Sequence, residues 1–397
     1  MEKMARHTQQ NLRFQPGELP VDLPIVLNHR SGNCRSTLFE QASCVLRKPI
    51  TLLLKTSKLN RQPRSIGQLD DDAFFDLWDQ KRFCKRFSLD DDAFRNMGFG
   101  QFEQKLAPSI RNWRNPKRLQ EYRTKIQDVL RLASQPRICP QCIGERASMR
   151  LNWRSQWLFA CTRHHVLLAN LCPSCHLPIA SQRRLSRVVV ANQCDNHPFR
   201  GDRCTQDLTE ITTTYLGRKH PAVKAQHLIE GLLNGHEMTQ LGRKQRAIDA
   251  LQLLRELVDF LALWQPISAL AGMTLLSGEL MDYRIETRAT WYRQWQQNSE
   301  AESEFAEPES IQFTNTSPAV WASVMPTAIA LASLLNAQDL EDKLFGYVCQ
   351  FCDDRVMEAE FVVSFLNRRL NRTQLPFLNV VFSELLGRVR RQFKIFA

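Results

Sequence analysis

The sequence predicts a mainly α, multi-domain protein in which helical N-terminal and C-terminal domains flank a central tandem zinc-knuckle module with short β segments. Three observations predict this fold class. Seven of the twelve cysteines lie between positions 139 and 204. β-prone runs flank these cysteines, and apolar residues recur at three- and four-residue spacing after Thr212. We therefore expect domains at 1–130, 131–210 and 211–397.

The N-terminal domain, 1–130, carries short helical signals. Ser36 can cap a helix that ends near Leu46. The hexapeptide Leu-Asp-Asp-Asp-Ala-Phe occurs at 69–74 and again at 89–94, each time ahead of a helical pattern. Clustered carboxylates could form a nuclease centre, but aspartates in this position more often cap a helix and complement its dipole. We interpret both runs as caps.

A basic segment ends this domain. Between Lys105 and Arg137 there are nine Lys and Arg residues against two acidic residues, with Trp113 and Tyr122 among them. Such a run suits phosphate contact with some base stacking, although a solvated helix face would explain part of it. The candidate residues for binding nucleic acid or a partner are Arg111, Arg114, Lys117, Arg118 and Arg123.

The overall charge also favours a polyanionic partner. The net charge is +12 and the isoelectric point is near 9.3, which suits DNA, RNA or a ribonucleoprotein. Met1–Pro20 is polar and interrupted by proline, so we expect no secretion signal, a cytoplasmic location and reduced cysteines. The apolar run Ala319–Leu335 falls short of the roughly 20 residues that span a membrane. We expect a buried helix there that begins near Pro326.

The central module offers two sets of zinc ligands. Cys139-Pro-Gln-Cys142 is followed after eighteen residues by Cys161-Thr-Arg-His164, and Cys172-Pro-Ser-Cys175 is followed after the same gap by Cys194. A Cys-x-x-Cys turn places two thiolates on one knuckle, and two knuckles complete the tetrahedron that zinc prefers. We predict two structural Zn²⁺ ions per chain, the first of them held by Cys139, Cys142, Cys161 and His164.

The fourth ligand of the second site has two candidates. The first set recurs 33 residues later at 172, 175, 194 and 197, which favours His197. The spacing of apolar residues favours Cys204, because Ile179 follows Cys175 by four residues and Leu208 follows Cys204 in the same way. With His197 as the alternative, we assign the second site to Cys172, Cys175, Cys194 and Cys204.

Short strands are predicted within the module at Trp153–Ala160 and Val188–Val190. Beyond it the pattern is helical, apart from an acidic, polar linker at about 296–317. Cys349 and Cys352 lie three residues apart in a helical pattern, which is more typical of core residues than of metal ligands. The expected helices are Val223–Leu233, Ala247–Trp264, Thr327–Leu335, Leu340–Phe351, Arg355–Leu366 and Leu378–Phe393.

Several motifs of the central module occur together, namely Arg131-x5-Arg-Ile-Cys-Pro-Gln-Cys142, Trp153 and Trp157, Cys161-x-x-His164 with Leu167 and Leu168, and Cys172-Pro-x-Cys175. This combination resembles the TniQ family, the target-selection proteins of transposons that also encode TnsA, TnsB and TnsC. Ala225–Glu237 looks like the segment that follows the zinc module in CRISPR-associated members. The resemblance is specific over 131–237. The helix-turn-helix expected at the N-terminus of the family is only hinted at by Pro16-Gly-Glu-Leu.

The resemblance implies a non-catalytic adaptor. TniQ-like proteins bind an attachment site themselves, as the longer TnsD-type members do, or bind an RNA-guided Cascade complex, and they then recruit the TnsC ATPase. Because this chain is short for a TnsD-type protein, we expect the Cascade-coupled form. That form implies a homodimer in contact with Cascade and TnsC, near target DNA or guide RNA and away from membranes. An all-cysteine second site would be unsurprising in this family.

The rival class is an enzyme with a catalytic zinc. A catalytic zinc keeps an open position beside three protein ligands, whereas each predicted set supplies four. The sequence contains no His-x-Glu, no His-Glu-x-x-His and no Gly-x-x-x-x-Gly-Lys loop, so we do not expect an enzyme. A zinc-containing transcription regulator is a third hypothesis.

Overall fold

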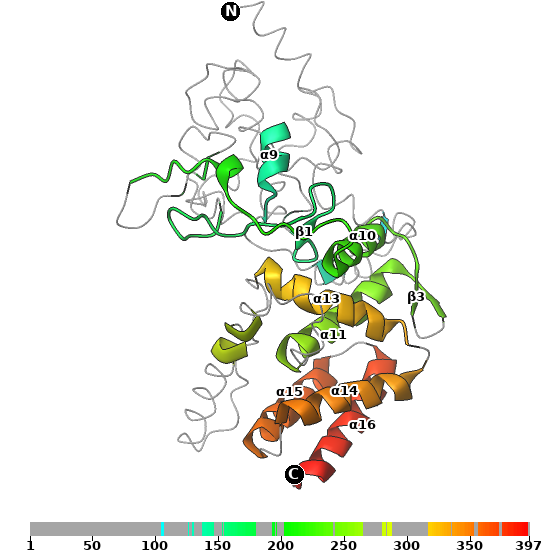
Figure 1. Cartoon of the computed structure of the whole chain (residues 1–397). Helices are drawn as coiled ribbons and strands as arrows, with labels where there is room; N and C mark the ends of the chain where they lie inside the picture. Colours follow the sequence, from blue (N-terminus) through cyan, green and yellow to red (C-terminus); the bar gives the residue numbers. More distant parts are fainter. Residues whose placement is uncertain are drawn as a thin grey trace, which may run out of the picture. The chain divides into compact units, whose positions relative to one another are not determined.

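The computed structural model divides the chain into two compact units, Met1–Arg218 and Lys219–Ala397. Its described elements are mainly α-helices with a few short strands, so the predicted fold class is confirmed (Figure 1). The expected N-terminal helices, the helix-turn-helix and the two aspartate runs lie outside the described residues. These residues are 105–106, 126, 129–130, 137–146, 153, 155–179, 193–194, 196, 202–240, 243–264, 280–282, 284–287, 317–334, 336–352, 356–372 and 375–395.

The first unit contains a short helix and a small β-hairpin. Helix α9 spans Pro140–Arg146. Strand β1, Ala160–Cys161, pairs antiparallel with β2, Val166–Leu167, so that the two residues of β1 lie opposite those of β2. The 3-10 helix η7, Leu208–Glu210, packs against α9. Helix α9 and the β1–β2 hairpin carry or adjoin the four predicted ligands of the first zinc site.

Within the segment Trp153–Ala160, the described residues (153 and 155–160) form a buried turn rather than the predicted strand, and only Ala160 belongs to β1. The Ser155 hydroxyl donates to the carbonyl of Leu130 at 2.9 Å, and the Trp157 indole N–H donates to the carbonyl of Val129 at 2.6 Å. Both carbonyls belong to residues with helical backbone. The Ser155 hydroxyl and the Trp157 indole therefore pair with backbone carbonyls of residues with helical backbone. These tertiary contacts outweigh the β-propensity of the aromatic residues in the segment.

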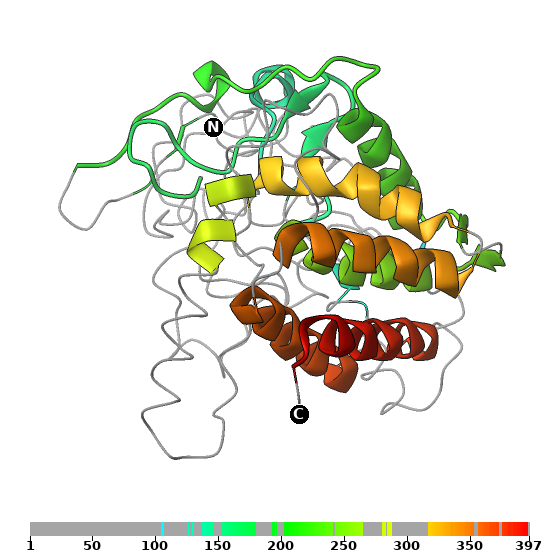
Figure 2. The same ribbon diagram turned by 60° about the horizontal axis from the view of Figure 1, so that its bottom comes forward.

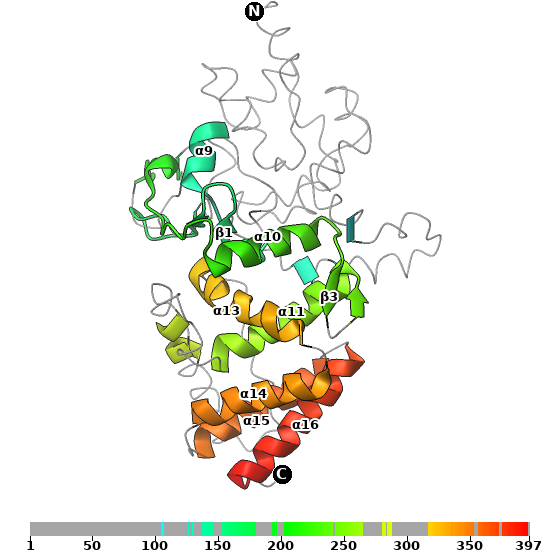
Figure 3. The same ribbon diagram turned by 45° about the vertical axis from the view of Figure 1, so that its right-hand side comes forward.

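The second unit is a helical bundle (Figures 2 and 3). Helices α10, α11 and α13 pack on one another, α14, α15 and α16 form a second group, and α11 also contacts α14. A hairpin of β3, Met238–Gln240, and β4, Arg243–Gln245, connects α10 to α11. The helices are α10 Pro221–Leu233, α11 Ala247–Trp264, α13 Pro318–Ala332, α14 Ala337–Cys352, α15 Val356–Arg372 and α16 Pro376–Phe393.

Proline opens three of these helices, where its missing N–H costs nothing and its ring favours helical backbone. Pro318 is the first residue of α13, and the Ser317 hydroxyl caps the helix by accepting from the Ala319 N–H at 3.1 Å. The predicted start near Pro326 is therefore wrong, because Pro326 lies inside the helix. A serine cap followed by proline is a strong start signal, and this pair precedes Pro326 in the chain.

Helix α11 lies at the centre of the bundle. Its aromatic residues Phe260 and Trp264 have ring centroids 4.8 Å apart, and Trp264 lies 4.5 Å from the ring of Phe365 on α15. Arg369 on α15 pairs with the buried carboxylates of Glu256 at 2.9 Å and Asp259 at 2.6 Å. The bundle thus combines aromatic packing with a buried three-residue ion cluster.

In the part of the chain that the structure describes, no helix has both the length and the apolar character required to cross a membrane. The apolar run that begins at Ala319 forms part of α13, which is 15 residues long. Cys349 and Cys352 both lie on α14.

Candidate metal centres

The first cluster joins the start of α9 to the β1–β2 hairpin. Cys139 directly precedes α9, and Cys142 lies in its first turn, so one helical start presents both sulfurs. Cys161 ends β1, and His164 lies in the turn that leads to β2. The cluster of Cys139, Cys142, Cys161 and His164 therefore collects two residues from each element.

The distances within this cluster suit a tetrahedral metal ion. The His164 Nδ1 atom lies 3.4 Å from the sulfur of Cys139, 3.3 Å from that of Cys142 and 3.6 Å from that of Cys161. The sulfurs of Cys142 and Cys161 are 3.7 Å apart. A tetrahedral zinc with bonds of about 2.3 Å to sulfur separates two sulfurs by about 3.8 Å, whereas a disulfide would hold them about 2 Å apart. The four donors thus fit one cation and not a disulfide.

Backbone hydrogen bonds hold the hairpin turn of this cluster in place. The His164 N–H donates to the sulfur of Cys161 at 3.4 Å, and the His165 N–H donates to the carbonyl of Cys161 at 2.8 Å. His165 completes the tight turn with φ of 55°, in the left-handed region that non-glycine residues seldom adopt. The turn aims the Cys161 and His164 donors at the same point.

The second cluster combines a knuckle with a pair of antiparallel segments. Cys172 and Cys175 lie in one turn, in which the His176 N–H donates to the Cys172 carbonyl at 2.9 Å and His176 has φ of 54°. This repeats the turn that follows Cys161. Cys194 and Cys204 come from segments that pair across the cluster. The Cys194 N–H donates to Gln206 O at 2.9 Å, and the Cys204 N–H donates to Asn196 O at 2.8 Å.

The sulfurs of the second cluster are spaced like those of the first. Cys172 Sγ lies 3.6 Å from Cys204 Sγ, and Cys175 Sγ lies 3.8 Å from Cys194 Sγ. The buried amide of Asn196 donates to the sulfur of Cys175 at 3.5 Å and to the carbonyl of Pro178 at 3.0 Å. These four thiols can hold a second cation, and the Asn196 amide would offset part of the negative charge on Cys175.

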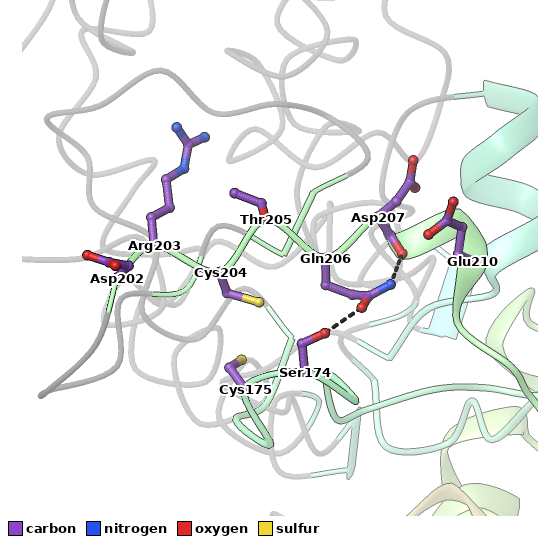
Figure 4. Close-up of a pocket in the computed structure, with 9 residues that line it drawn as sticks. All are labelled: Ser174, Cys175, Asp202, Arg203, Cys204, Thr205, Gln206, Asp207 and Glu210. Carbon is purple, nitrogen blue, oxygen red and sulfur yellow. Dashed lines mark hydrogen bonds between the residues drawn. The ribbon is translucent and has the colours of Figure 1, made fainter.

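One side of the second cluster faces a surface hollow of about 550 Å³. Cys175 and Cys204 lie beside it, and Figure 4 shows the Ser174 hydroxyl bonded to the Gln206 side chain along the same wall. Asp202, Asp207 and Glu210 complete the wall together with Arg203 and Thr205. Cys172 and Cys194 do not line the hollow and are fully buried. The second cluster is thus partly open to solvent.

The thiols of each cluster compete for ionisation. Hydrogen bonds with Cys139 and Cys161 raise the pKa of Cys142, while hydrogen bonds from Cys139 and Cys142 lower the pKa of Cys161. In the second cluster, burial raises the pKa of Cys204 to about 11. Because metal binding requires thiolates, a divalent cation at either cluster would displace these protons.

The structure brings the predicted ligands together as two separate groups of four. His197, the alternative fourth ligand, lies outside the described residues, and so do the candidate binding residues Arg111, Arg114, Lys117, Arg118 and Arg123.

Arg137, which the sequence places in the basic segment, is buried and does not belong to a basic surface. It is 3% exposed and donates from Nη1 to the carbonyls of Gln156 at 2.7 Å and Leu158 at 3.0 Å. A buried guanidinium that is bonded to backbone carbonyls cannot face a phosphate. Arg137 therefore helps to hold the buried turn that leads into β1.

Two polar residues beside the clusters were not identified from the sequence. Glu145 on α9 contacts His164, and Asn196 contacts Cys175. Only the spacing of Cys142 and Glu145, three residues apart on one helix, could have indicated that Glu145 lies near the first cluster. Asn196 had no comparable signal, because its contact depends on how two distant segments pair.

Comparison with known protein families gives one match. Residues 38–168 match the family model TniQ, while no curated protein and no solved structure matches the chain. The resemblance based on motifs covers residues 131–237. The family-model match begins earlier, at residue 38, and ends at residue 168, before Cys172. It contains all four residues of the first cluster. The match therefore supports the TniQ family over residues 38–168 of this chain.

Proposed function

We propose that this chain is a non-catalytic target-selection adaptor of a transposon, with two structural zinc ions. The observation that carries the proposal is the match of residues 38–168 to the TniQ family, because that family implies target selection for transposition. The first cluster lies within the matched stretch, and the second follows it directly in the sequence.

Zinc is the metal that best suits both clusters. Three thiols with one imidazole, or four thiols, at tetrahedral spacing are typical zinc donor sets. The first unit places the donors of the first cluster on or beside short elements, a hairpin with two-residue strands and a seven-residue helix. Such elements bury little apolar surface, so metal binding would supply folding free energy. The proposed ligands are Cys139, Cys142, Cys161 and His164 at the first site, and Cys172, Cys175, Cys194 and Cys204 at the second.

The donor sets also support a structural rather than a catalytic role. Each cluster supplies four protein donors, which would fill a tetrahedral shell and leave no position for water or substrate. A zinc hydrolase would need such an open position. The zinc ions would therefore hold the module in shape, and any selectivity for a target would come from its surfaces.

The finer proposal is that the adaptor, as a cytoplasmic homodimer, couples an RNA-guided Cascade complex at target DNA to the TnsC ATPase. It is supported by the resemblance of Ala225–Glu237 to CRISPR-associated members, and by a net charge of +12, which suits a partner that carries nucleic acid. In the structure this segment forms most of α10 and the turn after it.

A TnsD-type selector, which binds its attachment site directly, is the second candidate within the same family. The net positive charge of the chain favours this selector as much as it favours the Cascade-coupled adaptor, because direct DNA binding also requires phosphate contacts. A zinc-containing transcription regulator is the third candidate, and the TniQ match is the observation against it.

A reconstituted transposition reaction tests the adaptor role. The reaction contains donor DNA, TnsA, TnsB, TnsC and guide-loaded Cascade, and it is run with and without this chain. We expect targeted insertion to disappear without it, while strand transfer by TnsB on its own substrates continues. Insertion that persists without the chain, or cleavage of DNA by the pure protein, would refute the adaptor. Targeted insertion that needs the chain but not Cascade would favour the TnsD-type selector.

Charge reversal tests the basic segment. Glutamate at Arg111, Arg114, Lys117 and Arg118 should weaken binding to duplex DNA or to Cascade and flatten its salt dependence, because fewer counterions are released. A matched variant places glutamate at four exposed lysines of the second unit and should retain the salt slope. These lysines are Lys219, Lys224, Lys244 and Lys394. An equal effect of both variants would assign the binding to net charge alone.

A further inference from the structure

Glu145 occupies a position next to the first cluster that the proposed zinc shell does not explain. It lies on α9, three residues after Cys142, and its carboxylate faces the β1–β2 turn. One oxygen lies 3.0 Å from His164 Nε2, and the other lies 3.0 Å from Arg163 Nη1. Glu145 therefore bridges the element that carries two of the cysteines and the element that carries Cys161 and His164.

The contact with Glu145 determines which nitrogen of His164 carries the hydrogen. An ionised carboxylate can only accept hydrogen bonds, so Nε2 must donate and must carry the hydrogen. In a neutral imidazole the other nitrogen, Nδ1, then presents its lone pair. Nδ1 is the atom that lies 3.3 to 3.6 Å from the three sulfurs. The tautomer set by Glu145 is thus the one that can bind a metal among the thiols.

We propose that Glu145 is a positioning residue of the first metal centre, fixing the tautomer and ring orientation of His164. The inference rests on the proposed zinc at this cluster. A histidine ligand commonly donates its second ring N–H to a carboxylate, which fixes the ring and makes the ligating nitrogen more basic. Glu145 would do this from the same helix that presents Cys139 and Cys142.

The competing explanation is a surface ion pair between Glu145 and Arg163 that has no influence on the metal. The side chains of these residues are 38% and 52% exposed, so their pairing alone would contribute little. His164 is more buried, with 17% of its side chain exposed. The Glu145–His164 hydrogen bond should therefore contribute more to the stability of the site than the Glu145–Arg163 ion pair. Arg163 offsets part of the negative charge on the carboxylate.

The charges of the two clusters agree with this assignment. Four thiolates around Zn²⁺ would leave a net charge of about −2, whereas three thiolates with a neutral imidazole would leave about −1. The four-thiol cluster receives a hydrogen-bond donor, the Asn196 amide, at Cys175. The cluster with the imidazole instead places an acceptor, Glu145, on its histidine. Each neighbouring residue thus complements the group it contacts.

The test measures zinc release from the full, zinc-loaded chain to a chromogenic chelator. We expect Glu145→Ala to speed the release of one of the two zinc ions by about 10- to 100-fold, the usual effect of removing such a hydrogen-bond partner, and to leave the other unchanged. Glu145→Gln, whose amide oxygen can still accept from Nε2, should restore most of the difference. Arg163→Ala, which removes the ion pair but keeps the contact with His164, is the matched control and should release zinc like the wild type.

Nitrogen NMR of His164 supplies a readout that a purely structural role would not change. In the wild type, Nδ1 should show metal ligation and Nε2 should carry the hydrogen, and Glu145→Ala should broaden or shift both signals. Unchanged release by Glu145→Ala, or equal acceleration by Arg163→Ala, would overturn the role of Glu145 while leaving the zinc proposal intact. A wild-type chain that carries no zinc would instead refute the proposed metal centre itself.

Discussion

Replacing Arg137 with methionine tests whether this arginine supports the fold rather than a nucleic-acid surface. Its Nη1 donates to two carbonyls, those of Gln156 and Leu158. A hydrogen bond that involves a charged group contributes about 1.5–3 kcal/mol, and a buried carbonyl left unpaired adds a penalty. Burial also lowers the pKa of the Arg137 guanidinium, so removing it recovers some desolvation cost. Two such bonds would contribute about 3–6 kcal/mol together. We expect the free energy of unfolding to fall by about 3 kcal/mol, near the lower end of that range.

Urea unfolding of the zinc-loaded chain, followed by tryptophan fluorescence, measures this loss. Trp157 lies within the affected turn, between Gln156 and Leu158, and reports on it. With a slope of about 3 kcal/mol per M, the midpoint should fall by about 1 M at an unchanged slope. The exposed Lys105, from the same basic segment, provides the control, and Lys105→Met should leave the midpoint nearly unchanged. An unchanged midpoint for Arg137→Met, with a flatter salt dependence of nucleic-acid binding, would contradict the buried role.

Three further predictions concern helices and protons. Gly346→Ala on α14 should stabilise the chain by about 0.5–1 kcal/mol in thermal unfolding, because an added Cβ meets nothing within 4 Å. Gly231→Ala, where the Cβ would lie 3.2 Å from His236 Nδ1, should not. Arg369→Met should cost about 3–5 kcal/mol in urea unfolding because it removes the guanidinium that pairs with two buried carboxylates, and adding Glu256→Gln and Asp259→Asn should recover most of this loss. Burial raises the pKa of the Cys204 thiol to about 11 in the cluster without metal, so protons compete with zinc for this sulfur. Zinc release should accelerate from pH 8 to pH 5, and pH-independent release would contradict this competition.

Much of the candidate site could be predicted because its signals are local. A Cys-x-x-Cys turn fixes the separation of its two sulfurs, so the spacing of Cys139 with Cys142 and of Cys172 with Cys175 was enough to identify both knuckles. The helix Ala247–Trp264 was predicted with the bounds that the structure shows. Its apolar periodicity is sustained over several turns, which is the most reliable helix signal.

The features that could not be predicted depend on distant contacts. Whether Arg137 faces solvent or the buried turn depends on where the carbonyls of Gln156 and Leu158 lie, which no local pattern specifies. The aromatic run from Trp153 resembles a strand because the same residues suit a pleated sheet and a buried turn. The start of α13 was misplaced for a different reason, since two prolines competed for one role and only Pro318 follows a capping serine.

Elemental analysis of the purified chain, with site-specific variants, decides whether the two clusters hold zinc. The wild type should contain two zinc ions per chain, and Cys142→Ser and Cys204→Ser should each retain one. His197→Ala should retain both, whereas loss of one zinc from His197→Ala with none lost from Cys204→Ser would reverse the assignment of the fourth ligand. A wild-type chain that is folded and contains close to no zinc would contradict the two structural metal centres.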